Sequence, residues 1–171
     1  KFTVSLSDPT STRQIVLNTT RDVLADKEVR QALQHATNKQ TISEGIFYDL
    51  EQPADTLFAK TVPYCDIDLE PYAYDVELAQ SMLDEAGWVV GSDKIREKDG
   101  QKLNIDLLYN SDSVTEKAIA EYLQSEYQKI GIALNIHGEE EQSYRDNMKA
   151  GNFDMVFNIC WGTPYDPQSS L

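Results

Sequence analysis

The stretch Phe153-Asp-Met-Val-Phe-Asn-Ile-Cys-Trp-Gly-Thr-Pro-Tyr-Asp-Pro167 changes character halfway along its length. Its first half is an almost continuous apolar run, which is typical of a strand in a sheet that is covered on both faces. One glycine and two prolines in the second half cannot continue the strand, because glycine frees the backbone and proline removes a hydrogen-bond donor. We therefore expect a buried strand that leads into a loop carrying Trp161 and Tyr165.

Trp161 and Tyr165 are the first candidates for a ligand-binding surface. In open α/β sheets, ligands bind just beyond the carboxyl ends of the strands, which is where this loop would lie. The alternative interpretation is that both rings pack over the edge of the sheet, since tryptophan and tyrosine serve in cores and in binding sites alike. The residues themselves leave both interpretations open.

The residues before this strand alternate between strand-like and helix-like patterns. Residues 103–109 and 132–137 are predicted strands, and residues 139–150 form a predicted helix. A longer helix lies between the two strands and begins with the capping box Ser113-Val-Thr-Glu116. Strand–helix–strand–helix–strand with short joints predicts right-handed crossovers. The fold class is therefore α/β, with a mostly parallel sheet flanked by helices.

The first half of the chain is predicted to add a strand at Arg13–Asn18 and three helices. A short extended piece is expected at Thr56–Ala59, followed at residues 60–74 by an ordered segment without regular structure. Asp99-Gly100 predicts a hairpin turn, whose second strand pairs with Val89-Val90 or with residues near Ile95. The residues expected to cap the three helices are Asp26, Asn38 and Asp75.

Composition limits the classes of partner. The net charge of −14 argues against a nucleic-acid partner, which would need clustered lysine and arginine. Residues 61–93 contain eight acids and neither lysine nor arginine, and we interpret them mainly as a solvated face. No stretch approaches the roughly 20 apolar residues of a membrane span. The chain begins at Lys1 without a methionine or a signal peptide, so we expect a piece of a longer protein.

Catalytic motifs are absent from the sequence. There is no Gly-x-Ser-x-Gly elbow, no spaced cysteine–histidine pair and no phosphate-binding glycine loop. His137-Gly-Glu-Glu-Glu141 contains metal-ligand residue types, but glutamates at a helix N-terminus also complement the helix dipole. Cys65 and Cys160 are either free or joined in one disulfide, and their spacing does not decide which. This composition favours binding over catalysis.

Three stretches together resemble the family 5 bacterial extracellular solute-binding proteins, which serve peptide and nickel ABC importers. Val29-Arg-Gln-Ala-Leu-Gln-His-Ala-Thr-Asn-Lys-Gln-Thr-Ile42 is similar to the family's helix–Asn–helix signature. Pro71-Tyr-Ala-Tyr-Asp75 runs into Ala79-Gln-Ser-Met-Leu-Asp-Glu-Ala-Gly-Trp88, which matches a Tyr-Asp step and a helix ending in Ala-Gly-Trp. The third stretch is Gly151-Asn-Phe-Asp-Met-Val-Phe157 with the following tryptophan and Tyr-Asp-Pro step. The resemblance runs through essentially the whole chain.

The nickel-binding branch of the family is the most similar. Its features here are the Trp-Gly-x-Pro-Tyr-Asp-Pro form, Ala54-Asp-Thr-Leu-Phe-Ala59 and Ile95-Arg-Glu-Lys-Asp-Gly100. The resemblance implies that Trp161 and Tyr165 line the ligand cleft and wall in a nickel complex with a small chelator such as histidine. Arg13 also matches that branch, without an assigned contact. Gln168 departs from it, because nickel-type relatives often have histidine there.

The resemblance further implies that residues 1–171 form a single, partial lobe of a clamshell protein. The opposing lobe and a C-terminal segment, from which nickel-type members draw a histidine near the metal, would lie outside this chain. The implied protein is a monomer without a resident cofactor or enzymatic activity. It would lie in the periplasm, or outside the cell as a tethered lipoprotein, and would deliver its ligand to a membrane ABC permease. A peptide receptor of the same family is the first alternative, and a metal-dependent enzyme using the acids near His137 is the second.

Overall fold

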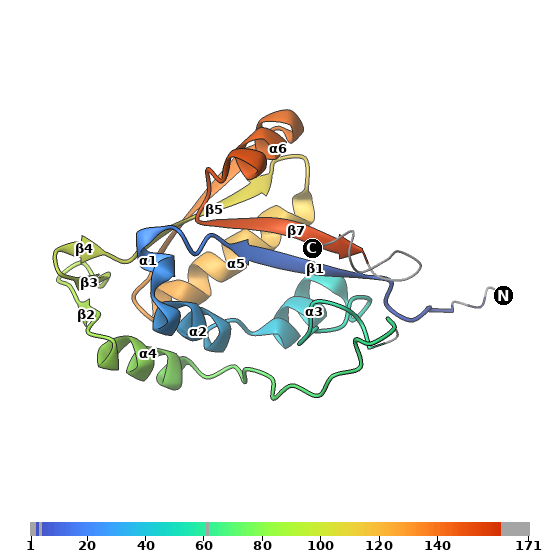
Figure 1. Cartoon of the computed structure of the whole chain (residues 1–171), viewed down its shortest axis with the longest axis horizontal. Helices are drawn as coiled ribbons and strands as arrows, with labels where there is room; N and C mark the ends of the chain where they lie inside the picture. The colour runs from blue at the N-terminus through green and yellow to red at the C-terminus, as the bar shows by residue number, and fades with distance from the viewer. Residues whose placement is uncertain (1–2, 4, 61, 162–171) are drawn as a thin grey trace.

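A four-stranded mixed sheet forms the centre of the molecule (Figure 1). The computed structural model describes residue 3, residues 5–60 and residues 62–161, with the backbone alone for Trp161. The strands, in their order across the sheet, are β1 (Ser11–Leu17), β7 (Met155–Trp161), β5 (Asn104–Asn110) and β6 (Ala133–Glu139). Strands β7, β5 and β6 are parallel, and β1 pairs antiparallel with β7 at one edge. The predicted α/β class with a mostly parallel sheet is confirmed.

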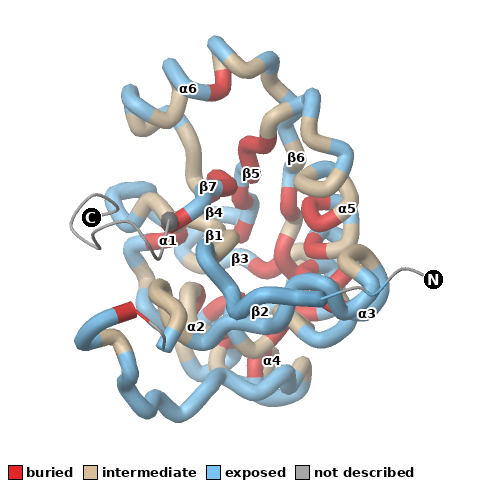
Figure 2. The backbone as a smooth tube through the Cα atoms, turned by 90° about the vertical axis from the view of Figure 1, so that its right-hand side faces the viewer, coloured by how far each residue is buried: buried red, intermediate tan, exposed pale blue. Residues whose placement is uncertain are grey.

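Helices cover both faces of this sheet. Helix α5 (Val114–Lys129) connects β5 to β6, and α6 (Glu141–Ala150) connects β6 to β7. Because side chains alternate along a strand, Ile105 and Leu107 of β5 enter the larger core with α5, while Leu108 packs toward α6. Figure 2 shows the buried residues concentrated around β5, β6 and α5, with α6 standing over the opposite face.

The helices in the first half of the chain are α1 (Asp22–Ala25), α2 (Lys27–His35), α3 (Lys39–Phe47) and α4 (Val76–Glu85). Helices α2, α3 and α4 begin at the predicted caps. The side chain of Asp26 accepts from Glu28 N at 3.0 Å, and that of Asn38 accepts from Thr41 N at 3.0 Å. Asp75 caps α4 in the same way. These bonds satisfy backbone donors that a helix N-terminus leaves free, while the four-residue α1 was not predicted.

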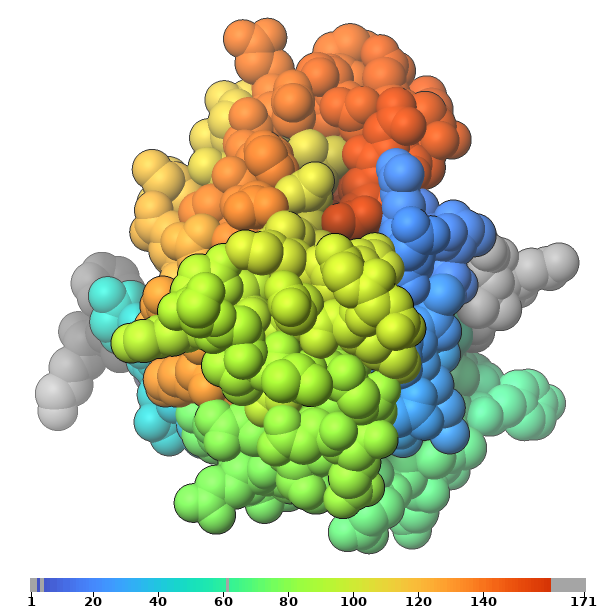
Figure 3. Space-filling view, turned by 90° about the vertical axis from the view of Figure 1, so that its left-hand side faces the viewer, coloured from blue at the N-terminus to red at the C-terminus, as the bar shows by residue number. Residues whose placement is uncertain are grey.

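A small antiparallel sheet follows α4. It consists of β2 (Val89–Val90), β3 (Arg96–Lys98) and β4 (Gln101–Lys102). Asp99 and Gly100 have φ values of 53° and 79°, which confirms the hairpin turn at this position. Strand β4 pairs with β3 and not with β2, so the second of the two expected pairings is correct. Figure 3 shows α4 and this sheet, in green to yellow-green, forming one end of the molecule.

The small sheet is joined to the body through the buried side chain of Arg96. Its guanidinium donates to the carbonyl of Ile130 at 2.8 Å and to that of Trp88 at 2.6 Å, and it pairs with Asp84. A buried guanidinium is costly unless its donors are satisfied. Arg96 therefore fixes β3 to the ends of both α4 and α5.

Between α3 and α4 the chain crosses the surface without a helix or a strand in the residues described, as predicted for residues 60–74. The predicted extended piece at Thr56–Ala59 is wrong, because Thr56 Oγ1 donates to the carbonyl of Phe58 at 2.7 Å and the chain bends there. The later part of the segment is fastened to the body. His35 Nδ1 donates to the carbonyl of Ala73 at 2.8 Å, and the hydroxyl of Tyr74 donates to Glu126 at 2.6 Å.

Candidate functional site

Strand β7 lies between β1 and β5 in the sheet, and its carboxyl end is the first candidate site. Trp161 is the last residue of this strand, and its backbone is paired with Ser11. The side chain of Trp161 and the whole of Tyr165 lie outside the described residues. Their assignment to the ligand cleft therefore stays a prediction. Trp161 was expected on the loop after the strand, but its backbone still belongs to β7.

Strand β7 extends past its neighbour on one side. It pairs with β5 through Met155 and Val156, its first two residues, and with β1 along its whole length. The far ends of β1 and β7 thus form a two-stranded arm, which lies above α3 at the right of Figure 1. We call Ser11–Arg13 together with Ile159–Trp161 the β1–β7 arm.

An ion pair and an aromatic ring lie beside this arm. Arg13 is opposite Ile159 in the register, and its guanidinium donates to the two carboxylate oxygens of Glu51 at 3.2 and 3.4 Å. The same guanidinium lies over the ring of Phe47, 5.4 Å from the ring centroid. Sequence analysis singled out Arg13 but not its partners, because neither is close to it in the chain.

The turn that carries Glu51 has a fixed backbone. Tyr48 and Asp49 both have positive φ, at 52° and 60°, and they reverse the chain at the end of α3. Ser43 Oγ then donates to the carbonyl of Glu51 at 2.6 Å. Tyr48 and Leu50 are exposed on this turn. The arm is therefore bordered by a fixed turn with exposed apolar side chains.

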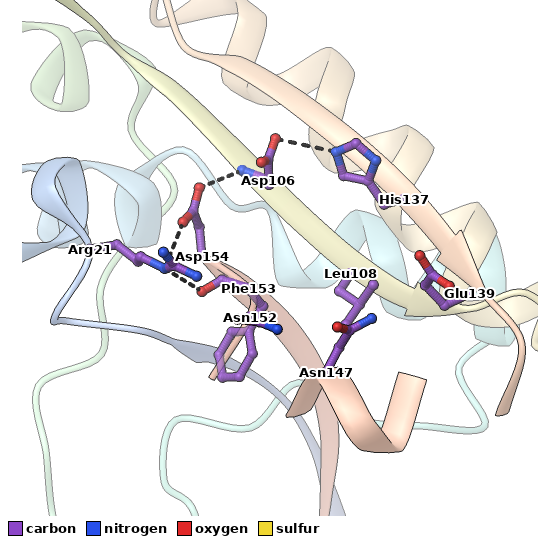
Figure 4. Close-up of a pocket in the computed structure, with 9 residues that line it drawn as sticks. All are labelled: Arg21, Asp106, Leu108, His137, Glu139, Asn147, Asn152, Phe153 and Asp154. Carbon is purple, nitrogen blue, oxygen red and sulfur yellow. Dashed lines mark hydrogen bonds and ion pairs between the residues drawn. The ribbon is translucent and has the colours of Figure 1, made fainter. Parts of the chain in front are cut away.

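A second candidate lies near the opposite end of β7, where a cavity of about 320 Å³ opens on the α6 side of the sheet. Figure 4 shows its polar groups linked in pairs: His137 to Asp106 at 3.2 Å, and Arg21 to Asp154 at 3.6 Å. Its lining residues are Arg21, Asp106, Leu108, His137, Glu139, Asn147, Asn152, Phe153 and Asp154. Acid–base pairs occupy much of the polar lining, so we assign this cavity no ligand.

The acidic stretch around His137 has structural partners. Glu139 accepts from Ser143 Oγ at 2.7 Å, and Glu141 pairs with Arg145 and accepts from Asn110. Within residues 5–60 and 62–160, no three histidine, cysteine or acidic side chains gather in a way that could hold a metal ion.

Two further sequence questions are answered by the structure. Cys65 is half-buried and Cys160 is buried, and both are free thiols. In the part of the chain that is described, no helix is long and apolar enough to cross a membrane.

Comparison with known proteins identifies the family. The family model for bacterial extracellular solute-binding proteins, family 5 Middle, matches residues 1–171. The chain belongs to this family, and its fold is that of the type II periplasmic binding proteins. The resemblance inferred from the three sequence stretches is thus confirmed.

Relatives of two ligand classes match the chain. The nickel-binding periplasmic protein of Escherichia coli K12 is 39% identical over 171 residues, which cover 99% of this chain and 33% of that protein. The oligopeptide-binding protein AppA of Bacillus subtilis 168 is 30% identical over 145 residues, or 80% of this chain and 26% of that protein. The chain spans between about a quarter and a third of the length of these two curated relatives.

Two solved structures of solute-binding proteins are also similar to this chain. NikA from Brucella suis, in complex with Fe(III)-EDTA, has a TM-score of 0.91 at 45% identity, covering 96% of this chain and 33% of that chain. NikZ from Campylobacter jejuni, in complex with Ni(L-His), has a TM-score of 0.82 at 29% identity, covering 92% and 31%.

Proposed function

We propose that the chain is one lobe of the substrate-binding component of an ABC importer, and that this receptor captures nickel as a small organic chelate such as nickel–histidine. The observation that carries the proposal is the β1–β7 arm, which puts Trp161 at a projecting strand end in a chain similar to two chelate-bound receptors. In this proposal Trp161 and Tyr165 form one wall of the ligand cleft.

The proposed mechanism is capture and closure. The two lobes of such a receptor close around the ligand by a hinge motion, after which the closed receptor docks on a membrane permease. One lobe supplies one wall, and a small-molecule site reaches high affinity only when most of the ligand surface is buried. The receptor acts outside the cytoplasmic membrane, as a monomer, without enzymatic activity and without a resident cofactor.

A peptide ligand is the second candidate. It is favoured by the similarity to the oligopeptide-binding protein AppA, which extends over 80% of this chain. An extended peptide needs a cleft with space for its backbone and groups for its termini. The two candidates therefore differ in the space that the opposing lobe leaves beside the β1–β7 arm.

A tryptophan-fluorescence titration of the two-lobed receptor tests the proposal. The titrants are nickel alone, nickel with free histidine, and a mixed dipeptide pool. We expect saturable quenching with the nickel–histidine mixture, and loss of this response in Trp161→Ala. Trp88 is buried and donates to Asp26 at 3.2 Å, so Trp88→Phe is the matched control and should keep the response. A response to peptides and none to nickel would contradict the nickel assignment and favour the peptide receptor.

A further inference from the structure

We propose that Arg13 binds a carboxylate group of the ligand, and that Glu51 is an internal competitor that occupies Arg13 until the ligand arrives. This inference rests on the proposed function, because it needs a ligand at the β1–β7 arm. The ligand class is a small molecule that carries a carboxylate, such as an amino-acid chelate of a metal or the C-terminus of a short peptide.

The position of Arg13 carries the first step. In the register of β1 and β7, Arg13 pairs with Ile159 and Ser11 pairs with Trp161. Since a strand rises about 3.4 Å per residue, Arg13 is only about 7 Å along the strand from the Ser11–Trp161 pair. Arg13 and Ser11 lie on the same face of β1, because they are two positions apart along the strand.

The ion pair between Arg13 and Glu51 carries the second step. The side chains of Arg13 and Glu51 are 27% and 46% exposed, so solvent and a ligand can reach both. Their two hydrogen bonds, at 3.2 and 3.4 Å, are longer than the roughly 2.7–2.9 Å of a strong charge-assisted pair. An exposed pair of this kind contributes little to stability. A ligand carboxylate can therefore replace Glu51 at small cost.

The surroundings of Arg13 are fixed independently of Glu51's carboxylate. The guanidinium lies over the ring of Phe47, where a cation is attracted to the aromatic face. The backbone of Glu51 is held by Ser43, which donates to its carbonyl. Glu51 can thus release Arg13 without moving the turn, and Arg13 keeps its position when it is released. A guanidinium held in this way presents the planar pair of donors that matches a carboxylate.

The test compares four variants of the two-lobed receptor by isothermal titration with two nickel complexes. Histidine and histamine share the imidazole and amine groups that chelate nickel, but histamine lacks the carboxylate, which in histidine can bind the metal through one oxygen and leave the other free. For nickel–histidine we expect Arg13→Gln to bind about tenfold more weakly, as for the loss of one charge-assisted pair. Arg13→Lys should lose less, because it keeps the charge without the planar fork. Glu51→Gln should bind about threefold more tightly, because the competitor is weakened.

Two controls make the result specific. Nickel–histamine should bind the wild type and Arg13→Gln equally. Arg21→Gln is the matched control variant. Like Arg13, Arg21 pairs with an acidic residue, but this residue is Asp154 near the opposite end of β7, so the substitution should leave both affinities unchanged. A structural role of the Arg13–Glu51 pair would weaken binding in Arg13→Gln and Glu51→Gln alike, and would do so for both complexes.

Failure of the proposal is distinguishable from failure of the proposed function. If the wild type binds nickel–histidine and Arg13→Gln binds it equally well, Arg13 is not the anchor and the nickel receptor stands. If the wild type binds dipeptides instead, the same variants are measured with a dipeptide and its C-terminal amide, and the same pattern is expected. A wild type that binds none of these ligands overturns both proposals.

Discussion

Gly131 follows the end of α5, and both its backbone conformation and its close neighbour Arg96 disfavour a larger residue there. Its φ is +82°, and a Cβ atom there would lie 2.8 Å from Cγ of Arg96. Arg96 cannot move away without losing its bonds to buried carbonyls. We expect Gly131→Ala to reduce the free energy of unfolding by about 1–3 kcal/mol, through the strained backbone and the overpacking.

Urea denaturation measures this effect, with Gly45→Ala as the control. Gly45 lies inside α3, and a Cβ atom there would meet nothing within 4 Å. That substitution should raise stability by about 0.5–1 kcal/mol, because alanine is the better helix former. Equal effects of the two substitutions would contradict this account of Gly131.

Asp26 should make stability depend on pH. Burial alone would raise the pKa of Asp26, but hydrogen bonds from Glu28, the Trp88 indole and the Lys98 ammonium lower it overall below 3.8. A lowered pKa in the folded state gives stability that is present above pH 3.8 and is lost as the pH falls through the folded-state pKa. Asp26→Asn keeps an oxygen for capping α2 and loses the ion pair with Lys98.

We expect Asp26→Asn to be about 1 kcal/mol less stable than the wild type at pH 7, and the difference to shrink below pH 4. Urea midpoints measured between pH 2 and pH 7 provide the measurement. A difference that is constant over this range would show that the carboxylate charge of Asp26 does not contribute.

At the scale of residues, sequence analysis predicted local bonds and missed distant ones. Ser113 accepts from Glu116 N at 3.2 Å, as the capping box predicts. The carboxylate of Glu116, however, accepts from Asn110 N and not from Ser113. The buried position of Arg96 had no sequence signal, because its partners come from α4, from Trp88 after that helix and from the end of α5, which only the tertiary fold brings together.

At the scale of elements, the surface segment before α4 is held to α5 by one side chain. Tyr74 donates to Glu126, a buried acid that also binds Lys129. The hydrogen bond to Glu126, together with burial, raises the pKa of Tyr74. We expect Tyr74→Phe to weaken this attachment by about 1–2 kcal/mol, since the lost bond is to a charged group.

Limited proteolysis and amide hydrogen exchange of residues 60–75 measure the attachment, because local opening sets both rates. Both rates should rise in Tyr74→Phe while exchange in β5 stays unchanged. Tyr64→Phe is the control, since Tyr64 is fully exposed at 102% and its hydroxyl makes no hydrogen bond among the described residues. Equal rates in Tyr74→Phe and the wild type would show that other contacts hold the segment.

Elements with a strong pattern were predicted to within about two residues. Strand β5 was expected at residues 103–109 and spans Asn104–Asn110. The four-residue α1 and the two-residue β2 and β4 are too short to carry a helical or strand period. The order of the strands was not predicted, since the pairing of β1 with β7 joins residues about 150 positions apart.

At the scale of the whole molecule, the proposed function predicts that the isolated chain is a poor binder. In that proposal it offers one wall of a two-walled cleft. We expect it to bind nickel–histidine at least about a hundredfold more weakly than the two-lobed receptor, which corresponds to about 3 kcal/mol. Isothermal titration of both proteins under the same buffer conditions measures this ratio. Equal affinities would mean that the chain holds a complete site and would contradict the two-lobed mechanism.

The candidate site was predictable only in part, because it depends on a pairing between strands that are distant in the sequence. The apolar run before Trp161 predicted a strand, which the structure confirms, whereas the proline-rich stretch after it lies outside the described residues. The neighbours of that strand end, Arg13 with Glu51 and Phe47, come from two separate parts of the chain. Their meeting depends on β1 lying against β7, which no local pattern encodes.

The pairing of Ser11 with Trp161 also bears on the order in which the sheet assembles. Paired residues on adjacent strands are about 5 Å apart, so β1 and β7 meet only when a loop of nearly the whole described chain has closed. Closing so long a loop costs conformational entropy, and such non-local strand pairs slow folding. We therefore expect β1 to join the sheet after β5, α5 and β6 have formed their more local contacts.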